Sequence, residues 1–325
     1  MKKRGILPLA ALMAALILDS RCAAASAAVS LELCLRTLIP ALFPLLVVGA
    51  MLVPRLSQVR LRGLSRLLGI PEGSEGIAIL GCVGGFPVGA ACAVQAVQSG
   101  GLDRRQAQRM LGMVSFCGPS FLFGVVGNVL STEQAAMLFL IQLETAVLLG
   151  LLWPGSGGNP FRGDAMEAVS LGDALLRSIR SMALVCGWVV LAGVAGGLLR
   201  KWPASFLPSA AVTVLSGILE LTNGVLALPT IPSPGLRLIL CTGFVCFGGV
   251  SVLLQIGALA SSAGIPMNTC ILQKSVQAML GMAIAAGAAR FGWAALLPGC
   301  LLPAAKIAVE ISGRMVYNGE RKEGI

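Results

Sequence analysis

The chain has 325 residues, of which 56% are hydrophobic and 12% charged, and its mean hydropathy is +0.88. A soluble domain cannot bury that much apolar surface, so the composition excludes an ordinary globular protein and indicates a chain that lies largely in a lipid bilayer. The net charge of +10 falls mostly in short segments between apolar runs, a distribution that fits the positive-inside rule and argues against nucleic acid as a partner. The sequence contains no histidine, which excludes a histidine proton relay, histidine metal ligands and a Ser-His-Asp triad.

The chain begins with a short basic segment followed by an apolar run. Lys2–Arg4 precedes Gly5–Leu18, a pattern that fits either a cleaved signal peptide or an uncleaved signal anchor. Because further apolar runs follow, we predict an anchor over residues 1–22 and place its N-terminus in the cytoplasm. We expect the next segment, Ala23–Arg36, to form a helix at the outer surface.

Apolar runs that approach the roughly 20 residues of a membrane-spanning helix recur along the chain. Inside a bilayer such a run must satisfy its own backbone hydrogen bonds, which a helix does within one segment. The sequence therefore predicts an all-α, polytopic membrane protein. The runs are Ile6–Leu18, Leu38–Val53, Ala135–Trp153, Met182–Leu199, Leu238–Ala260, Ile271–Ala289 and Trp293–Ile311.

Two apolar segments of the first half are interrupted. Gly76–Ser99 is broken by Gly84-Gly85-Phe86-Pro87 and has basic residues on both sides. A straight crossing would leave one basic cluster outside, so we predict a re-entrant hairpin that enters and leaves on the cytoplasmic side. Met110–Leu130 is broken by Gly118-Pro119-Ser120, which predicts a transmembrane helix that unwinds at the proline.

Two segments of the second half are interrupted in the same order. Phe206–Leu228 carries Glu220-Leu221-Thr222-Asn223-Gly224 in its middle, and we predict a second re-entrant hairpin there. Leu236–Ala260 is broken by Gly248-Gly249-Val250-Ser251, and Gln255 follows one turn later on the face of Ser251. This pattern predicts a second broken transmembrane helix.

The order of these segments divides the chain into two similar halves. We predict a first repeat over residues 23–153, a linker rich in Gly, Pro and Ser over 154–170, and a second repeat over 171–290. A final transmembrane helix and a cytoplasmic tail occupy 291–325. Each repeat crosses the membrane three times, and because this number is odd the second repeat is inserted upside down. The predicted fold is therefore an inverted repeat.

The four interruptions predict a central site for a small polar solute, because a broken membrane helix is tolerated only where the break is buried in protein or lines a wet cavity. A carboxylate in the middle of such a segment costs about 2.5–3.5 kcal/mol, which makes Glu220 a functional candidate. The predicted solute contacts are Gly84, Gly85, Phe86, Pro87, Gly118, Pro119, Ser120, Glu220, Thr222, Asn223, Gly248, Gly249, Ser251 and Gln255.

Several of these residues also have a purely structural interpretation. Gly81, Gly85 and Gly89 have GxxxG spacings that favour close helix packing without a hairpin tip. Glu220 is also compatible with a loop at the membrane surface, because prolines follow shortly after it. Gly193/Gly197 is interpreted as packing only.

Other polar residues in the apolar segments receive structural interpretations. Gln142 and Glu144 are expected to bond a neighbouring helix, whereas Gln273, Lys274 and Gln277 are expected at the membrane interface. The ten cysteines are interpreted as small packing residues.

Signatures of catalysis are weak. The sequence has no P-loop, no HExxH and no nucleophile elbow, so we predict no enzyme, no cofactor and no metal site. A coupling cation, Na⁺ or H⁺, is left open, as is a homo-oligomer.

Four runs resemble a known family. Leu38-Ile39-Pro40-Ala41-Leu42-Phe43-Pro44, Gly84-Gly85-Phe86-Pro87-Val88-Gly89-Ala90, Cys117-Gly118-Pro119-Ser120-Phe121-Leu122-Phe123-Gly124 and Gly248-Gly249-Val250-Ser251-Val252-Leu253-Leu254-Gln255 look like the sporulation integral membrane protein family (the YlbJ-like group). This family is related to the nucleoside-recognition, or gate, domain superfamily, and the resemblance covers most of residues 30–290. The family more commonly has Tyr or Leu at the position of Phe86, and Lys in many members at the position of Ala91.

The resemblance implies a spore-forming bacterial source and a distant similarity to concentrative nucleoside transporters, in which two re-entrant hairpins and two broken helices meet at the substrate. The leading hypothesis is a sporulation-associated, multi-pass protein of the inner membrane, in the forespore or mother cell, that transports a small polar, nucleoside-like solute. The alternative is a non-transporting membrane scaffold for assembly of the spore cortex or coat.

Overall fold

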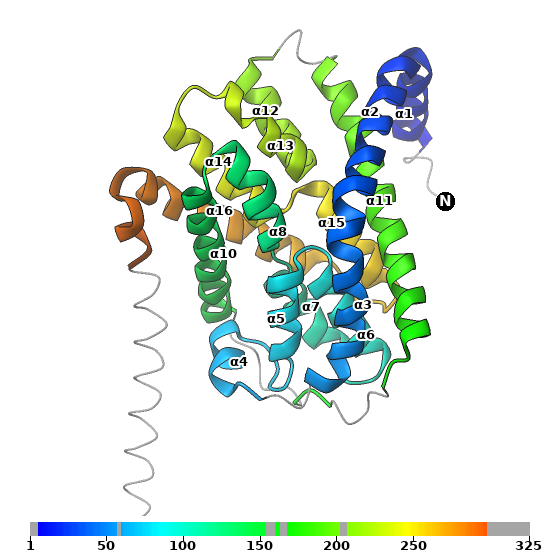
Figure 1. Cartoon of the computed structure of the whole chain (residues 1–325), viewed down its shortest axis with the longest axis vertical. Coiled ribbons are helices and arrows are strands. Elements are labelled where there is room, and N and C mark those ends of the chain that lie inside the picture. The colour runs from blue at the N-terminus through cyan, green and yellow to red at the C-terminus, as the bar shows by residue number, and fades with distance from the viewer. Residues whose placement is uncertain (1–5, 57–59, 154–159, 163–167, 202–206, 298–325) are drawn as a thin grey trace, which may run out of the picture.

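The computed structural model describes residues 6–56, 60–153, 160–162, 168–201 and 207–297, and this part of the chain is helical, without strands (Figure 1). The helices of the first half are α1 (Ile6–Leu18), α2 (Ser20–Leu33), α3 (Ile39–Leu56), α4 (Arg62–Leu68), α5 (Glu75–Gly84), α6 (Val88–Gln98), α7 (Arg104–Met113), α8 (Pro119–Phe121), α9 (Gly127–Val129) and α10 (Thr132–Leu152). Those of the second half are α11 (Leu171–Lys201), α12 (Ser209–Leu219), α13 (Leu221–Ala227), α14 (Pro234–Phe247), α15 (Gly249–Ser261) and α16 (Asn268–Phe291).

Five helices of the described chain are long and apolar enough to cross a membrane, which confirms a multi-pass membrane protein. They span Ser20–Leu56, Thr132–Leu152, Leu171–Lys201, Pro234–Ser261 and Asn268–Leu296. Many large apolar side chains on these helices are exposed, among them Leu140, Leu176, Leu191 and Leu272. Lipid is the solvent that suits such a surface. The predicted last span, Trp293–Ile311, lies outside the described residues beyond Leu297.

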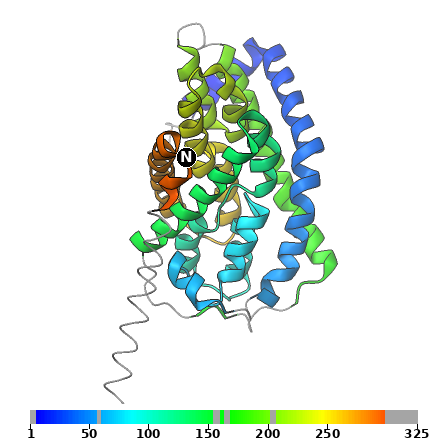
Figure 2. The same cartoon turned by 60° about the vertical axis from the view of Figure 1, so that its left-hand side comes forward.

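The N-terminal region differs from the prediction. Ala23–Arg36 is no separate surface helix, because α2 continues through a π-helical turn at Cys34–Leu38 into α3, and together they form one rod along the side of the molecule (Figure 2). The alanine-rich α2 favours helix and contains no breaker. Pro40 has no N–H to donate to the preceding turn of the helix. The π-helical turn at Cys34–Leu38, just before it, accommodates the missing hydrogen bond.

The helices α2 and α11 pack closely through two glycines. A Cβ atom at Gly193 would overlap the hydroxyl of Ser30, and one at Gly197 would overlap the hydroxyl of Ser26. The Ser30 hydroxyl donates a hydrogen bond of 2.9 Å to the Ser26 carbonyl, so it is held in the contact. This geometry confirms the interpretation of Gly193 and Gly197 as packing residues.

We expect Gly193→Ala to destabilise the protein by about 1–3 kcal/mol, because the added methyl group must displace Ser30 or separate the helices. Gly187→Ala, on the same helix, is the matched control: a Cβ there meets nothing within 4 Å, and alanine favours helix by about 1 kcal/mol over glycine. Thermal unfolding of the purified variants in detergent measures the difference. Equal stability of the two variants would contradict the proposed close contact.

Two pairs of short helices fold back on themselves. α5 and α6 are joined by a three-residue tip, and a Cβ at Gly81 would lie 3.1 Å from the Gly89 Cα. α12 and α13 are joined at Glu220, and Gly224 lies against Gly217. In Figure 1, α5 and α6 lie in the lower part of the molecule and α12 and α13 in the upper part, with α8 between them. Both pairs are therefore helical hairpins directed toward the centre.

Candidate functional site

The first predicted break is the tip of the α5–α6 hairpin. α5 ends at Gly84, α6 begins at Val88, and the Phe86–Pro87 peptide bond is cis. Gly85 has φ 72° and ψ −167°, a conformation that is almost restricted to glycine. A Cβ at Gly85 would lie 2.6 Å from the Gly118 nitrogen. The tip therefore touches the second predicted break directly.

The second break covers Val114–Gly118, immediately before Pro119. α7 ends at Met113, and the chain has no helical structure until Pro119 opens α8. Pro119 cannot donate a backbone hydrogen bond and its ring clashes with the carbonyl four residues before it, so helix is excluded on its N-terminal side. In the unwound segment the Cys117 N–H donates to Gln142 Oε1 (2.7 Å), and Gln142 Nε2 donates to the Cys117 carbonyl (3.1 Å). Gln142 has the structural role expected of it, but its side chain bonds the unwound segment and not a neighbouring helix.

The third break is the single residue Glu220, which has extended backbone between α12 and α13. Its carboxylate caps α13 by accepting from the backbone N–H groups of Thr222 (3.0 Å) and Asn223 (2.7 Å). Glu220 is 6% exposed, so its carboxylate lies inside the protein and not in a surface loop. Two backbone donors and the N-terminal end of a helix stabilise its negative charge.

The fourth break is Gly248, which has a left-handed conformation (φ 85°) between α14 and α15. Gln255 Nε2 donates to the Ser251 hydroxyl (3.2 Å), as their spacing predicts. A Cβ at Gly248 would lie 3.1 Å from the Phe86 ring, and one at Gly249 would lie 3.2 Å from the Leu221 nitrogen. The fourth break thus contacts both the first and the third.

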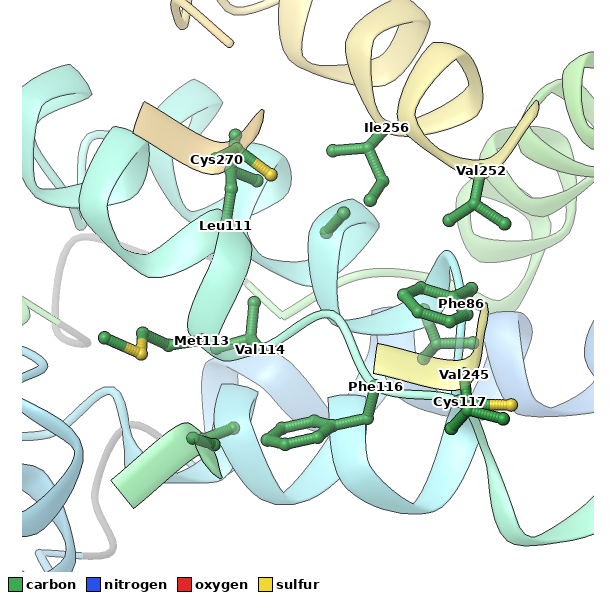
Figure 3. Packing of buried hydrophobic residues seen from close by; sticks show 14 of the residues in the cluster. Phe86, Leu111, Met113, Val114, Phe116, Cys117, Val245, Val252, Ile256 and Cys270 are labelled. Carbon is green, nitrogen blue, oxygen red and sulfur yellow. The ribbon is translucent and has the colours of Figure 1, made fainter. Parts of the chain in front are cut away.

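A cavity of about 90 Å³ lies at the junction of these contacts. Figure 3 shows Phe86 at this junction, with Val252 of α15, Val245 of α14 and Cys117 close by. The predicted residues that line the cavity are Gly84, Gly85, Phe86, Gly118, Ser120, Glu220, Thr222 and Gln255. Pro87, Pro119, Asn223, Gly248, Gly249 and Ser251 are not part of its lining. The remaining wall, which the sequence did not predict, is Leu38, Leu42, Cys117, Phe121, Val185, Val189, Leu221 and Val252.

Beside this cavity lies a buried lysine, and its position corrects the sequence-based prediction. Gln273, Lys274 and Gln277 were expected at the membrane interface, but all three are fully buried. Lys274 Nζ donates to the Ser115 carbonyl (2.9 Å) and to Gln277 Oε1 (2.6 Å). It also lies 5.1 Å from the centre of the Phe86 ring, so it contacts both breaks of the first half.

Further hydrogen bonds connect this lysine to the support of the second break. Gln277 Nε2 donates to the Gln142 carbonyl (3.3 Å) and to the Thr145 hydroxyl (3.2 Å). α10 and α16 are thereby joined by a polar network within apolar helices. The signal in the sequence was the pair Lys274 and Gln277, one turn apart in an apolar run, because an ionisable residue inside a span is functional more often than incidental. Among the described residues, no group of three or more Cys, Asp or Glu side chains is placed to hold a metal ion.

No family model, curated protein or solved structure matches this chain. The resemblance to the sporulation membrane protein family therefore stays a prediction based on four sequence runs. Three of those runs coincide with structural breaks, at Gly85, at Cys117–Gly118 and at Gly248.

Proposed function

We propose that this protein is a carrier that moves a small polar solute across a bacterial inner membrane through the central cavity, by alternating access. The observation that carries the proposal is that three helix breaks line one pocket and the fourth, at Gly248, packs against two of them, in an otherwise apolar protein. Broken helices at the middle of a membrane protein offer backbone donors and acceptors to a solute. Glu220 and Gln255 add side-chain groups to the same cavity.

We further propose that the fold is an inverted repeat in which α5–α6 and α12–α13 are re-entrant hairpins. The order of elements supports this arrangement. Each half has a long helix (α3 or α11), a helical hairpin, a helix interrupted by a break (α7–α9 or α14–α15) and a long unbroken helix (α10 or α16). The two hairpins approach the centre from opposite ends (Figure 1). By the positive-inside rule, the end with Arg55, Arg104 and Arg105 faces the cytoplasm, as Lys2–Arg4 does in our topology.

The size of the cavity limits the solute in this conformation. A volume of about 90 Å³ corresponds to roughly three water molecules, whereas sites for drug-sized ligands measure about 300–1,000 Å³. A nucleoside-like solute therefore requires the hairpin tips to separate. We interpret the structure as a closed state, and the resemblance adds a role in endospore formation to the proposal.

The proposal is tested by transport of an identified solute. Purified protein is screened by thermal shift against nucleosides, amino acids and organic acids, with and without Na⁺, and each stabilising compound is then tested for uptake into proteoliposomes. Saturable uptake that exceeds that of empty liposomes supports a carrier. Stable, correctly inserted protein without uptake of any stabilising compound would favour the scaffold alternative.

We expect Glu220→Gln to reduce uptake at least about tenfold while the protein still inserts. The amide keeps one acceptor for the cap of α13, so the loss of stability stays within about 0.5–2 kcal/mol, but the negative charge at the cavity is lost. Glu144→Gln is the matched control, because Glu144 is a half-buried carboxylate on α10 outside the cavity lining. Initial uptake rates in proteoliposomes measure the effect. Normal uptake by Glu220→Gln would contradict a role for this charge.

A further inference from the structure

We infer that Lys274 serves as a tethered monovalent cation: its ammonium group fills a cation site built by the two breaks of the first half and α16, so that no free Na⁺ is needed at this position. The role of this cation in transport rests on the proposed function. The cation site itself can be tested without any transport measurement.

The groups around the ammonium are those of a cation site. Ser115 contributes a backbone carbonyl from the unwound segment, Gln277 a side-chain amide oxygen, and Phe86 the face of its ring. Carbonyls of unwound membrane helices coordinate monovalent cations in transporters, and an aromatic face attracts a cation within about 6 Å. An ammonium group has three donors and no acceptor, and two of its donors are used on these oxygens.

The partners of Lys274 are uncharged. Ser115, Gln277 and Phe86 carry no formal charge, and neither the Arg36–Glu32 nor the Lys201–Asp19 ion pair involves Lys274. A buried charge ordinarily needs a charged partner or several oriented dipoles. Here neutral dipoles and a ring stabilise it, as they stabilise a bound ion.

The ammonium group of Lys274 joins three segments of the fold. Ser115 belongs to the unwound segment, Phe86 to the hairpin tip and Gln277 to α16. Since Phe86 and Cys117 both line the central cavity, a cation that joins their segments holds one side of the cavity in place. A tethered cation cannot leave, so this contact persists whichever ions are present.

Chemical rescue tests this inference. Lys274→Ala removes the ammonium and leaves room for a small cation, whereas Lys274→Met removes the charge but fills the room. Thermal unfolding of each purified protein is measured in choline chloride, NaCl and methylammonium chloride at equal ionic strength. We expect the wild-type melting temperature to be the same in all three salts, and that of Lys274→Ala to be at least about 5 °C lower in choline.

The expected rescue is specific. Methylammonium restores at least roughly half of the loss in Lys274→Ala, Na⁺ restores it to a smaller or equal extent, and neither restores Lys274→Met. Absence of rescue in Lys274→Ala, or equal rescue in Lys274→Met, overturns the inference. If Lys274→Ala yields no folded protein in choline, extraction is repeated in methylammonium: folded protein there supports the cation site, and its absence overturns it.

The outcome is separable from that of the proposed function. Rescue of Lys274→Ala without uptake of any solute would support the cation site and contradict the carrier function. Uptake by the wild type without rescue of Lys274→Ala would support the carrier function and contradict the cation site.

Discussion

Replacement of Gln142 with leucine is expected to destabilise the protein by about 2–6 kcal/mol. The side-chain amide of Gln142 makes two hydrogen bonds to the backbone of Cys117, and it is fully buried. Leucine leaves the Cys117 N–H and carbonyl without these partners, and each buried unsatisfied group costs about 1–3 kcal/mol. The unwound segment then either rewinds or moves, and the cavity beside it is lost.

Two variants make the test specific. Gln142→Glu keeps an acceptor for the Cys117 N–H, and its buried carboxyl becomes neutral and carries one O–H that can donate to the Cys117 carbonyl. Because that protonation has a cost, its stability is expected to lie between those of the wild type and the leucine variant. Glu144→Gln, on the same helix, is expected to unfold like the wild type. Unfolding in mixed detergent micelles measures all three proteins. A leucine variant as stable as Glu144→Gln would show that Gln142 does not support the break.

The second large effect is expected at Gly85. Alanine there requires a backbone with φ 72° and ψ −167° and places a methyl group 2.6 Å from the Gly118 nitrogen. Strain of this kind costs about 1–3 kcal/mol, and displacement of backbone by an added carbon atom costs about 1–3 kcal/mol more. We expect Gly85→Ala to destabilise the protein by about 2–6 kcal/mol and to abolish uptake, because the hairpin tip cannot stay against the second break.

Gly100→Ala is the matched control for this prediction. Gly100 also has a positive φ (75°), but a Cβ atom there meets nothing within 4 Å. Its substitution therefore reports the cost of a positive φ without the contact between breaks. Thermal unfolding and uptake are measured for both variants. Equal loss of stability in the two would show that the contact between Gly85 and Gly118 adds nothing to the effect.

The positions of the breaks were largely predictable from sequence because they are local. Pro119 excludes helix before it, and Gly85 and Gly248 adopt conformations that few other residues tolerate. The support of the second break was not predictable. It depends on Gln142, which is far away in the sequence and supplies the hydrogen bonds that the unwound backbone needs.

The burial of Lys274 was not predictable either, because a lone lysine near the start of an apolar run usually extends its charge to the membrane surface. Its side chain instead points inward, where Ser115, Gln277 and Phe86 meet it. Those partners come from three segments that lie together only in the folded chain. The pair Lys274 and Gln277 indicates a polar site within the span, but local sequence carries no signal for which distant segments surround it.

The sequence by itself determined that the chain is helical and multi-pass and where its helices break, since hydropathy, glycine and proline act on a segment and its immediate neighbours. Only the tertiary structure decided that the breaks meet. Their contact at Gly85, Gly118, Phe86 and Gly248 depends on how the hairpins pack between the long helices. Packing also decided the narrow volume of the cavity and the uncharged surroundings of Lys274, because both are properties of surfaces that face one another across the fold.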